Sequence, residues 1–244
     1  MFKRRVCAIE NAHAHILRAT GWIIKQMRTP TPRSPIPDPR SPIPDPRSPI
    51  LTGSRQPDPM RQTLRAATHG IHERLHRHPA LAAVQDGTID HVAYRRLLAR
   101  LYGFHIGFER AARIKPERSV WLEMDVAALG INPEQLAAQP LCRGFPALAL
   151  PEALLGALYV VEGSALGGVT LARGLDRLIG VGVLDGRRFF TGHKSETGSA
   201  WRAYLRRLSA TPHSAEQQAT IVATATATFA LFESWLGGWN ETNA

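Results

Sequence analysis

Four histidines lie within one short stretch of the chain: His69, His72, His76 and His78. Residues three and four apart share a face of an α-helix, so the first three of these side chains can line one side. A metal site is one hypothesis, although no accompanying pattern of Cys, Asp or Glu ligands is evident. A surface or helix-capping role is the alternative, and the spacing leaves both open.

A second unusual stretch runs from Tyr159 to Gly168 and contains Gly163, Gly167 and Gly168. Each glycine in a helix costs about 1 kcal/mol relative to alanine, so three within six residues need a compensating reason. The helix could kink and press its backbone against a flat ligand, or it could cross another helix closely. Both interpretations are open on the sequence alone.

A third feature is the pair Arg202 and Arg206. The two residues are four apart, so their guanidinium groups project from one helix face and could receive carboxylates. A solvated helix surface explains such a pair equally simply.

These side chains lie in segments whose apolar residues recur at helical spacing, and no segment alternates as a strand does. The clearest stripe is formed by Val92, Leu97, Leu98, Leu101, Phe104, Phe108 and Ala111. Ser214 and Gln217 fit a capping box that starts the last helix, which ends near Leu236. We therefore predict an all-α, single-domain helical bundle. The expected helices cover residues 61–77, 92–111, 117–129, 151–179, 195–208 and 214–236.

Residues 1–59 differ from the rest of the chain. They hold eleven of the eighteen prolines, and the heptad Pro-Arg-Ser-Pro-Ile-Pro-Asp occurs twice and begins a third time. Proline removes a backbone donor and disfavours helix, so this segment is predicted to be an extended or disordered extension. The repeat favours a start assigned too early, with Met60 as the natural start and 60–244 as the folded domain, over a proline-rich ligand for a recognition domain.

Composition narrows the classes of protein that fit. Residues 1–59 hold 10 Lys or Arg and 4 Asp or Glu, so +6 of the net charge of +10 belongs to them and the domain is only mildly basic. This argues against nucleic acid as a partner. No uninterrupted run of about 18 apolar residues suggests a membrane span. Only Cys7 and Cys142 occur, which fits a reducing compartment, and we expect a soluble, cytoplasmic protein.

Taken together in this order, the three stretches resemble the heme oxygenase family, particularly its bacterial members and those that serve bacteriophytochromes. The stretch from Leu64 to His72 is similar to the family's first-helix motif of Leu, a basic residue, Ala, any residue, Thr, three residues and His. The stretch from Tyr159 to Gly168 is similar to the distal-helix signature Tyr-x-x-Glu-Gly-Ser-x-Leu-Gly. The resemblance covers nearly all of residues 60–239.

The resemblance implies that heme lies between the first helix and a kinked, glycine-rich distal helix. His72 would be the axial ligand of the heme iron, and the family often has a carboxylate one turn later, where this chain has His76. Glu73 is adjacent to His72 in sequence and is expected to face elsewhere on the helix. On the distal side, the residues implied in catalysis are Gly163, Ser164 and Gly167. The residues implied in binding heme, mainly through its propionates, are Arg65, Tyr159, Gly168, Arg202 and Arg206.

The implied reaction is the oxidative opening of heme to biliverdin, with release of carbon monoxide and ferrous iron. Electrons would come from a separate reductase or ferredoxin, because no flavin or nicotinamide fingerprint is visible. A bacteriophytochrome could accept the biliverdin. The alternatives are a heme carrier or sensor without turnover, a non-heme relative of the same fold, and a helical interaction module without a ligand.

Overall fold

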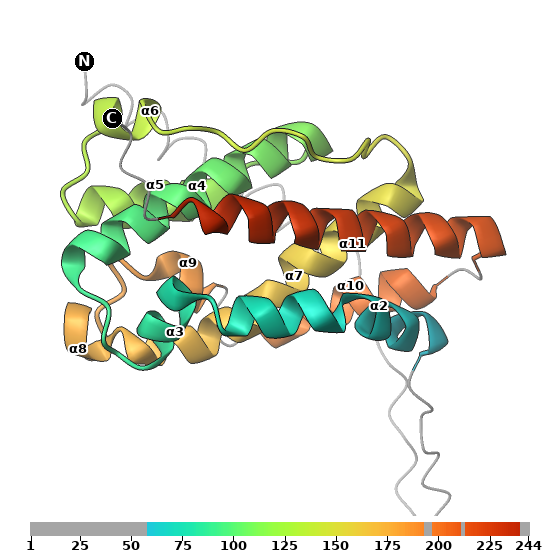
Figure 1. The fold of residues 1–244 in the computed structure, drawn as a ribbon, viewed down its shortest axis with the longest axis horizontal. Helices are drawn as coiled ribbons and strands as arrows, with labels where there is room; N and C mark the ends of the chain where they lie inside the picture. The colour runs from blue at the N-terminus through green and yellow to red at the C-terminus, as the bar shows by residue number, and fades with distance from the viewer. Residues whose placement is uncertain (1–57, 193–196, 211–212, 240–244) are drawn as a thin grey trace, which may run out of the picture. The chain divides into compact units, whose positions relative to one another are not determined.

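The computed structural model describes residues 58–192, 197–210 and 213–239, and within them it is all-helical. The expected extension at residues 1–59 lies almost wholly outside this part. Figure 1 shows how the helices are arranged. The helices are α2 (Pro59–His76), α3 (Pro79–Gln85), α4 (His91–Ala112), α5 (Arg118–Ala128), α6 (Pro133–Ala137), α7 (Pro151–Gly174), α8 (Asp176–Ile179), α9 (Arg188–Thr191), α10 (Thr197–Ser209) and α11 (Ala215–Gly237).

Helices α7 and α11 form the centre of the helical unit. They pack closely because Gly156 of α7 has no side chain, so that its backbone can rest against the carbonyl of Ile221 on α11. Figure 1 shows α11 crossing in front of α7. Helix α2 packs on α11, and α10 packs on α7, with buried Tyr204 donating a 3.0 Å hydrogen bond to the carbonyl of Leu155. The central pair therefore positions the helices that carry the predicted site.

The same two central helices are long and apolar enough to meet a length-and-composition criterion for a membrane span. Their best 18-residue windows have mean hydropathies of 1.5 and 1.3. This differs from the sequence prediction, which found no uninterrupted apolar run long enough for a membrane span. About a third of each window, 33%, is buried inside the structure. The two helices pack against each other.

Helix α2 begins before the expected domain start at Met60. Asp58 is its N-cap: the carboxylate accepts a 2.8 Å hydrogen bond from the backbone N–H of Met60, and Pro59 occupies the first turn. The same carboxylate accepts a hydrogen bond from the hydroxyl of Ser209, at the end of α10. Asp58 therefore ties the start of α2 to α10, and the helical unit needs at least this residue upstream of Met60.

We expect Asp58→Ala to lower the free energy of unfolding by about 1 kcal/mol, because the first turn of α2 loses its cap. Chemical denaturation followed by circular dichroism measures this difference. Glu123→Ala, a change at an exposed residue of α5, serves as the control and should stay within about 0.5 kcal/mol of the parent. Equal stability of the Asp58→Ala protein and the parent would contradict the capping role.

Two details differ from the sequence prediction. The helix expected over residues 151–179 is broken at Leu175, because buried Arg187 donates hydrogen bonds to the carbonyls of Ala172, Leu175 and Gly180 around the break. Val92 and Ala111, the two ends of the apolar stripe predicted for α4, are both exposed, Val92 by 58%. The capping box of Ser214 and Gln217 at the start of α11 is confirmed.

Candidate functional site

Four glycines of α7 lie along one side of the helix: Gly156, Gly163, Gly167 and Gly174, spaced seven, four and seven residues apart. Both ends of this side are covered by backbone. The carbonyl of Ile221 on α11 lies against Gly156, and the carbonyl of Val84 on α3 lies against Gly174. Any larger side chain at either end would collide with a neighbouring helix.

The middle of the same side is not covered in this way. A Cβ on Gly163 would meet only the ring of Trp201, at 3.6 Å, and a Cβ on Gly167 would meet nothing within 4 Å. Helices α11, α3 and α10 contact α7 around the uncovered part. Helix α2 packs on all three of them. The α7 backbone at Gly163 and Gly167 is therefore left accessible, on the side of α7 that these three helices and α2 surround.

Gly168 lies outside this row. A Cβ there would lie 3.0 Å from the carbonyl oxygen of Phe190 on α9, so close helix packing accounts for this glycine. Its predicted contact with heme rests on the resemblance alone. Of the two interpretations of the glycine stretch, helix crossing suits Gly168, whereas Gly163 and Gly167 need another explanation.

His72 projects from α2 with 54% of its side chain exposed. Its ring packs edge-on against that of His76, with centroids 4.5 Å apart, and lies 6.4 Å from the ring of Phe229 on α11. Partial burial, then the neighbouring His76, lowers the pKa of His72, which keeps the imidazole neutral and able to donate to a metal. The predicted shared face of His72 and His76 is confirmed.

Glu73 lies closer to this imidazole than its sequence position suggested. We expected it to face elsewhere, but its Oε1 lies 4.0 Å from Nδ1 of His72, because the glutamate side chain is long enough to lie beside the preceding residue. This distance is too long for a hydrogen bond. The carboxylate nevertheless raises the pKa of His72 in opposition to burial, and it is placed on the Nδ1 side of the ring.

The other predicted residues surround the same region. Arg65 is exposed on α2, two turns before His72, and close enough to affect its pKa. Tyr159 of α7 is half-buried beside Trp201, with ring centroids 5.8 Å apart. Ser164 is exposed, and its hydroxyl donates a 2.8 Å hydrogen bond to the carbonyl of Val161.

The two predicted arginines of α10 are both exposed. Nη2 of Arg202 donates a 2.9 Å hydrogen bond to the hydroxyl of Ser199, which orients this guanidinium, and Arg206 follows one turn later. Helix α10 packs on both α7 and α2. It therefore places a positive edge next to the two helices that carry the histidine and the glycines.

The sequence did not indicate a polar cluster behind the glycine stretch. Buried Arg118, at the start of α5, donates a 3.0 Å hydrogen bond to the carboxylate of Glu162, the residue before Gly163. Burial and the nearby Arg118 hold the pKa of His105 on α4 well below its usual range, and its Nδ1 has no hydrogen-bond partner. The motif itself pointed to Glu162, but nothing local could connect it with a residue 44 positions away.

We expect Arg118→Met to destabilise the protein by about 1–3 kcal/mol, because it leaves the carboxylate of Glu162, 26% exposed, without its partner. Glu162→Leu in the same chain should recover part of the loss, since both charges are then gone. Denaturant unfolding of the two single variants and the double variant measures the coupling. Additive effects would show that the ion pair does not hold α5 to α7.

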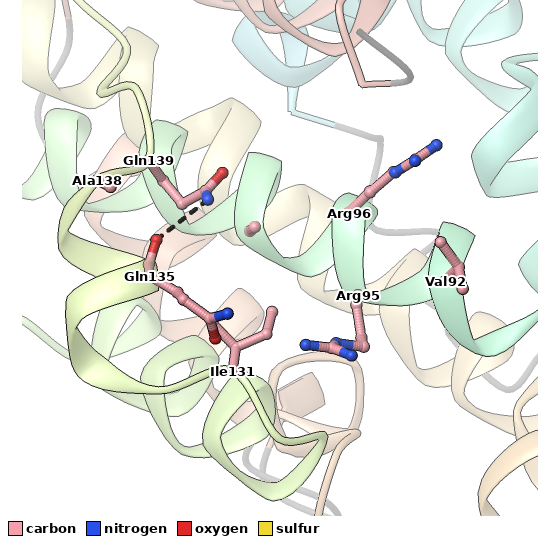
Figure 2. Close-up of a pocket in the computed structure, with 8 residues that line it drawn as sticks. Val92, Arg95, Arg96, Ile131, Gln135, Ala138 and Gln139 are labelled. Carbon is pink, nitrogen blue, oxygen red and sulfur yellow. Dashed lines mark hydrogen bonds between the residues drawn. The ribbon is translucent and has the colours of Figure 1, made fainter. Parts of the chain in front are cut away.

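A cavity of about 420 Å³ lies elsewhere, between α4 and α6 (Figure 2). Its polar side chains already have partners: Arg95 donates to the carbonyl of Gly130, Gln135 caps α6, and Gln139 donates to the carbonyl of Gln135. Figure 2 shows Arg96 pointing away from Gln135. This cavity contains none of the predicted site residues.

Comparisons with known proteins agree with the geometry. The family model described as heme oxygenase matches residues 58–237. No curated protein matches the chain. Among solved structures, a domain of unknown function with a heme oxygenase-like fold from Shewanella denitrificans OS217 is 15% identical, with a TM-score of 0.59, and the match covers 75% of this chain and 92% of that one. The chain belongs to the heme oxygenase family.

Proposed function

We propose that the protein binds heme between α2 and α7 and opens it oxidatively to biliverdin, with release of carbon monoxide and ferrous iron. The observation that carries this proposal is the uncovered row of Gly163 and Gly167, flanked by packed glycines at both ends of the same side. A flat macrocycle needs such backbone access. Membership of the family supplies the chemical class.

The residues present fit heme. His72 is a neutral, accessible imidazole, and because Glu73 lies beside Nδ1, the other nitrogen, Nε2, is the atom left for iron. Arg65, Arg202 and Arg206 are exposed positive groups suited to the two propionates. They would fix the rotation of the macrocycle and with it the carbon that is oxidised.

Bound heme would supply iron for oxygen activation and its own ring as the substrate. The protein's part is placement. Gly163 and Gly167, which carry no side chain, would let the macrocycle approach the α7 backbone. The hydroxyl of Ser164 donates its hydrogen bond to the carbonyl of Val161. Its oxygen therefore remains free to accept a hydrogen bond from an ordered water.

Electrons must come from a separate reductase or ferredoxin-type donor, and a bacteriophytochrome is a proposed acceptor of the product. A cytoplasmic location fits these partners. The mildly basic domain, with exposed arginines on α2 and α10, suits an acidic donor.

The test is an absorption time course of the full chain mixed with hemin, then given ascorbate or a ferredoxin reducing system in air, with catalase present. We expect loss of the Soret band and growth of a broad red biliverdin band. A stable heme complex that never bleaches with several donors would instead indicate a carrier or sensor. No binding of hemin would indicate a non-heme relative of the same fold.

A further inference from the structure

The exposed side of α2 carries two imidazoles in edge-on contact. His72 and His76 are four residues apart, and their ring centroids are 4.5 Å apart with the rings edge-on. Both side chains are exposed. Two histidines in adjacent turns can direct their nitrogens to one point in front of the helix.

The intervening residues add to the resemblance to a metal-binding helix. His72-Glu73-Arg74-Leu75-His76 has the spacing His-Glu-x-x-His, in which two imidazoles bind zinc from one helix face. The carboxylate of Glu73 lies 4.0 Å from Nδ1 of His72, so Nε2 is the nitrogen of this ring left open to an ion. The sequence showed no accompanying pattern of further metal ligands. The structure brings two histidine side chains together.

Helix α2 is held in place independently of these rings. Arg74 donates two hydrogen bonds, of 2.6 and 2.9 Å, to the carboxylate of Glu233 on α11. Phe229 on the same helix lies against His72. The pair therefore sits on a supported helix, which reduces the ordering that binding an ion would require.

We propose that His72 and His76 form a two-imidazole chelate for a divalent transition-metal ion such as Zn²⁺. Within the part of the chain that the structure describes, no group of three or more His, Cys, Asp or Glu side chains could hold a metal. Water completes the coordination, and the ion exchanges readily. With two protein ligands on an exposed surface, the site differs from a closed, four-ligand structural zinc site.

The chelate has a consequence for heme, and this step rests on the proposed function. His72 has one nitrogen, Nε2, on the side away from Glu73. An ion bound there occupies the lone pair that heme iron would use. Zn²⁺ and heme therefore compete for His72, and only the zinc complex needs His76.

The experiment titrates the full, metal-free chain with ZnCl₂ by isothermal titration calorimetry. His76→Ala and His72→Ala are each expected to weaken binding of one equivalent by at least about tenfold, since loss of even an outer-sphere partner costs metal sites that much. His91→Ala, at an exposed histidine of α4, is the matched control and should bind like the parent. All other histidines remain in every variant, so the differences isolate this pair.

A second titration follows the Soret band as hemin is added with and without Zn²⁺. The parent should bind hemin more weakly when zinc is present, whereas His76→Ala should bind it equally well in both conditions. Undiminished zinc binding in His76→Ala, or no zinc binding by the parent, overturns the chelate. If hemin does not bind even without zinc, the proposed function fails, and the calorimetry still decides the zinc site.

Discussion

His72→Ala is expected to abolish the opening of heme while leaving the protein folded. Loss of the axial imidazole should lower heme affinity by more than the roughly 10–100-fold that loss of an outer-sphere partner costs metal sites. Because about half of the side chain is exposed, the free energy of unfolding should change by no more than about 0.5 kcal/mol. Hemin titration, the turnover time course and denaturant unfolding measure the three quantities.

His69→Ala is the matched control, since His69 is exposed one turn earlier on the same helix. It should retain both the Soret spectrum and turnover. Added imidazole should restore an imidazole-ligated spectrum to His72→Ala. If His72→Ala kept the parent spectrum and His76→Ala lost it, the axial ligand would be His76.

The second large effect is expected at Gly167. Leucine is a better helix former than glycine by roughly 0.5–1 kcal/mol, and its side chain would enter space in which the Cβ meets nothing within 4 Å. We therefore expect Gly167→Leu to fold at least as stably as the parent and to lose heme binding, because the side chain fills the space proposed for the macrocycle. Unfolding and hemin titration on the same sample measure the two opposite effects.

Gly168→Ala is the natural comparison. Its Cβ would lie 3.0 Å from the carbonyl of Phe190, so we expect a loss of stability, with heme affinity reduced only as far as α7 shifts. Normal heme affinity in Gly167→Leu would contradict the placement of heme over this side of α7.

The long helices could be predicted from the sequence because their patterns are local. Five apolar residues predicted for the stripe of α4, Leu97, Leu98, Leu101, Phe104 and Phe108, are buried, and the capping box marked the start of α11. The break after α7 could not be predicted, because it depends on Arg187, which donates to carbonyls from a segment beyond it. Helices α3, α6 and α9 are too short to show a period.

The candidate site likewise has a part that local spacing predicts and a part that depends on contacts between distant segments. The shared face of His72 and His76 follows from their spacing, whereas the contact of Arg118 with Glu162 joins helices that no local pattern relates. Gly167 and Gly168 are adjacent, and only the resemblance gave them different roles. The structure distinguishes them by packing, because the carbonyl of Phe190 lies beside Gly168 and not beside Gly167.

The two kinds of glycine in α7 place the protein's evolution under unequal constraints. A change at Gly156 or Gly174 strikes a neighbouring backbone, so the altered chain would be removed by misfolding and degradation. A change at Gly167 is expected to cost the fold nothing, since a Cβ there meets nothing within 4 Å. A related chain with a larger residue at position 167 is therefore expected to keep an intact bundle and to lack the proposed heme site.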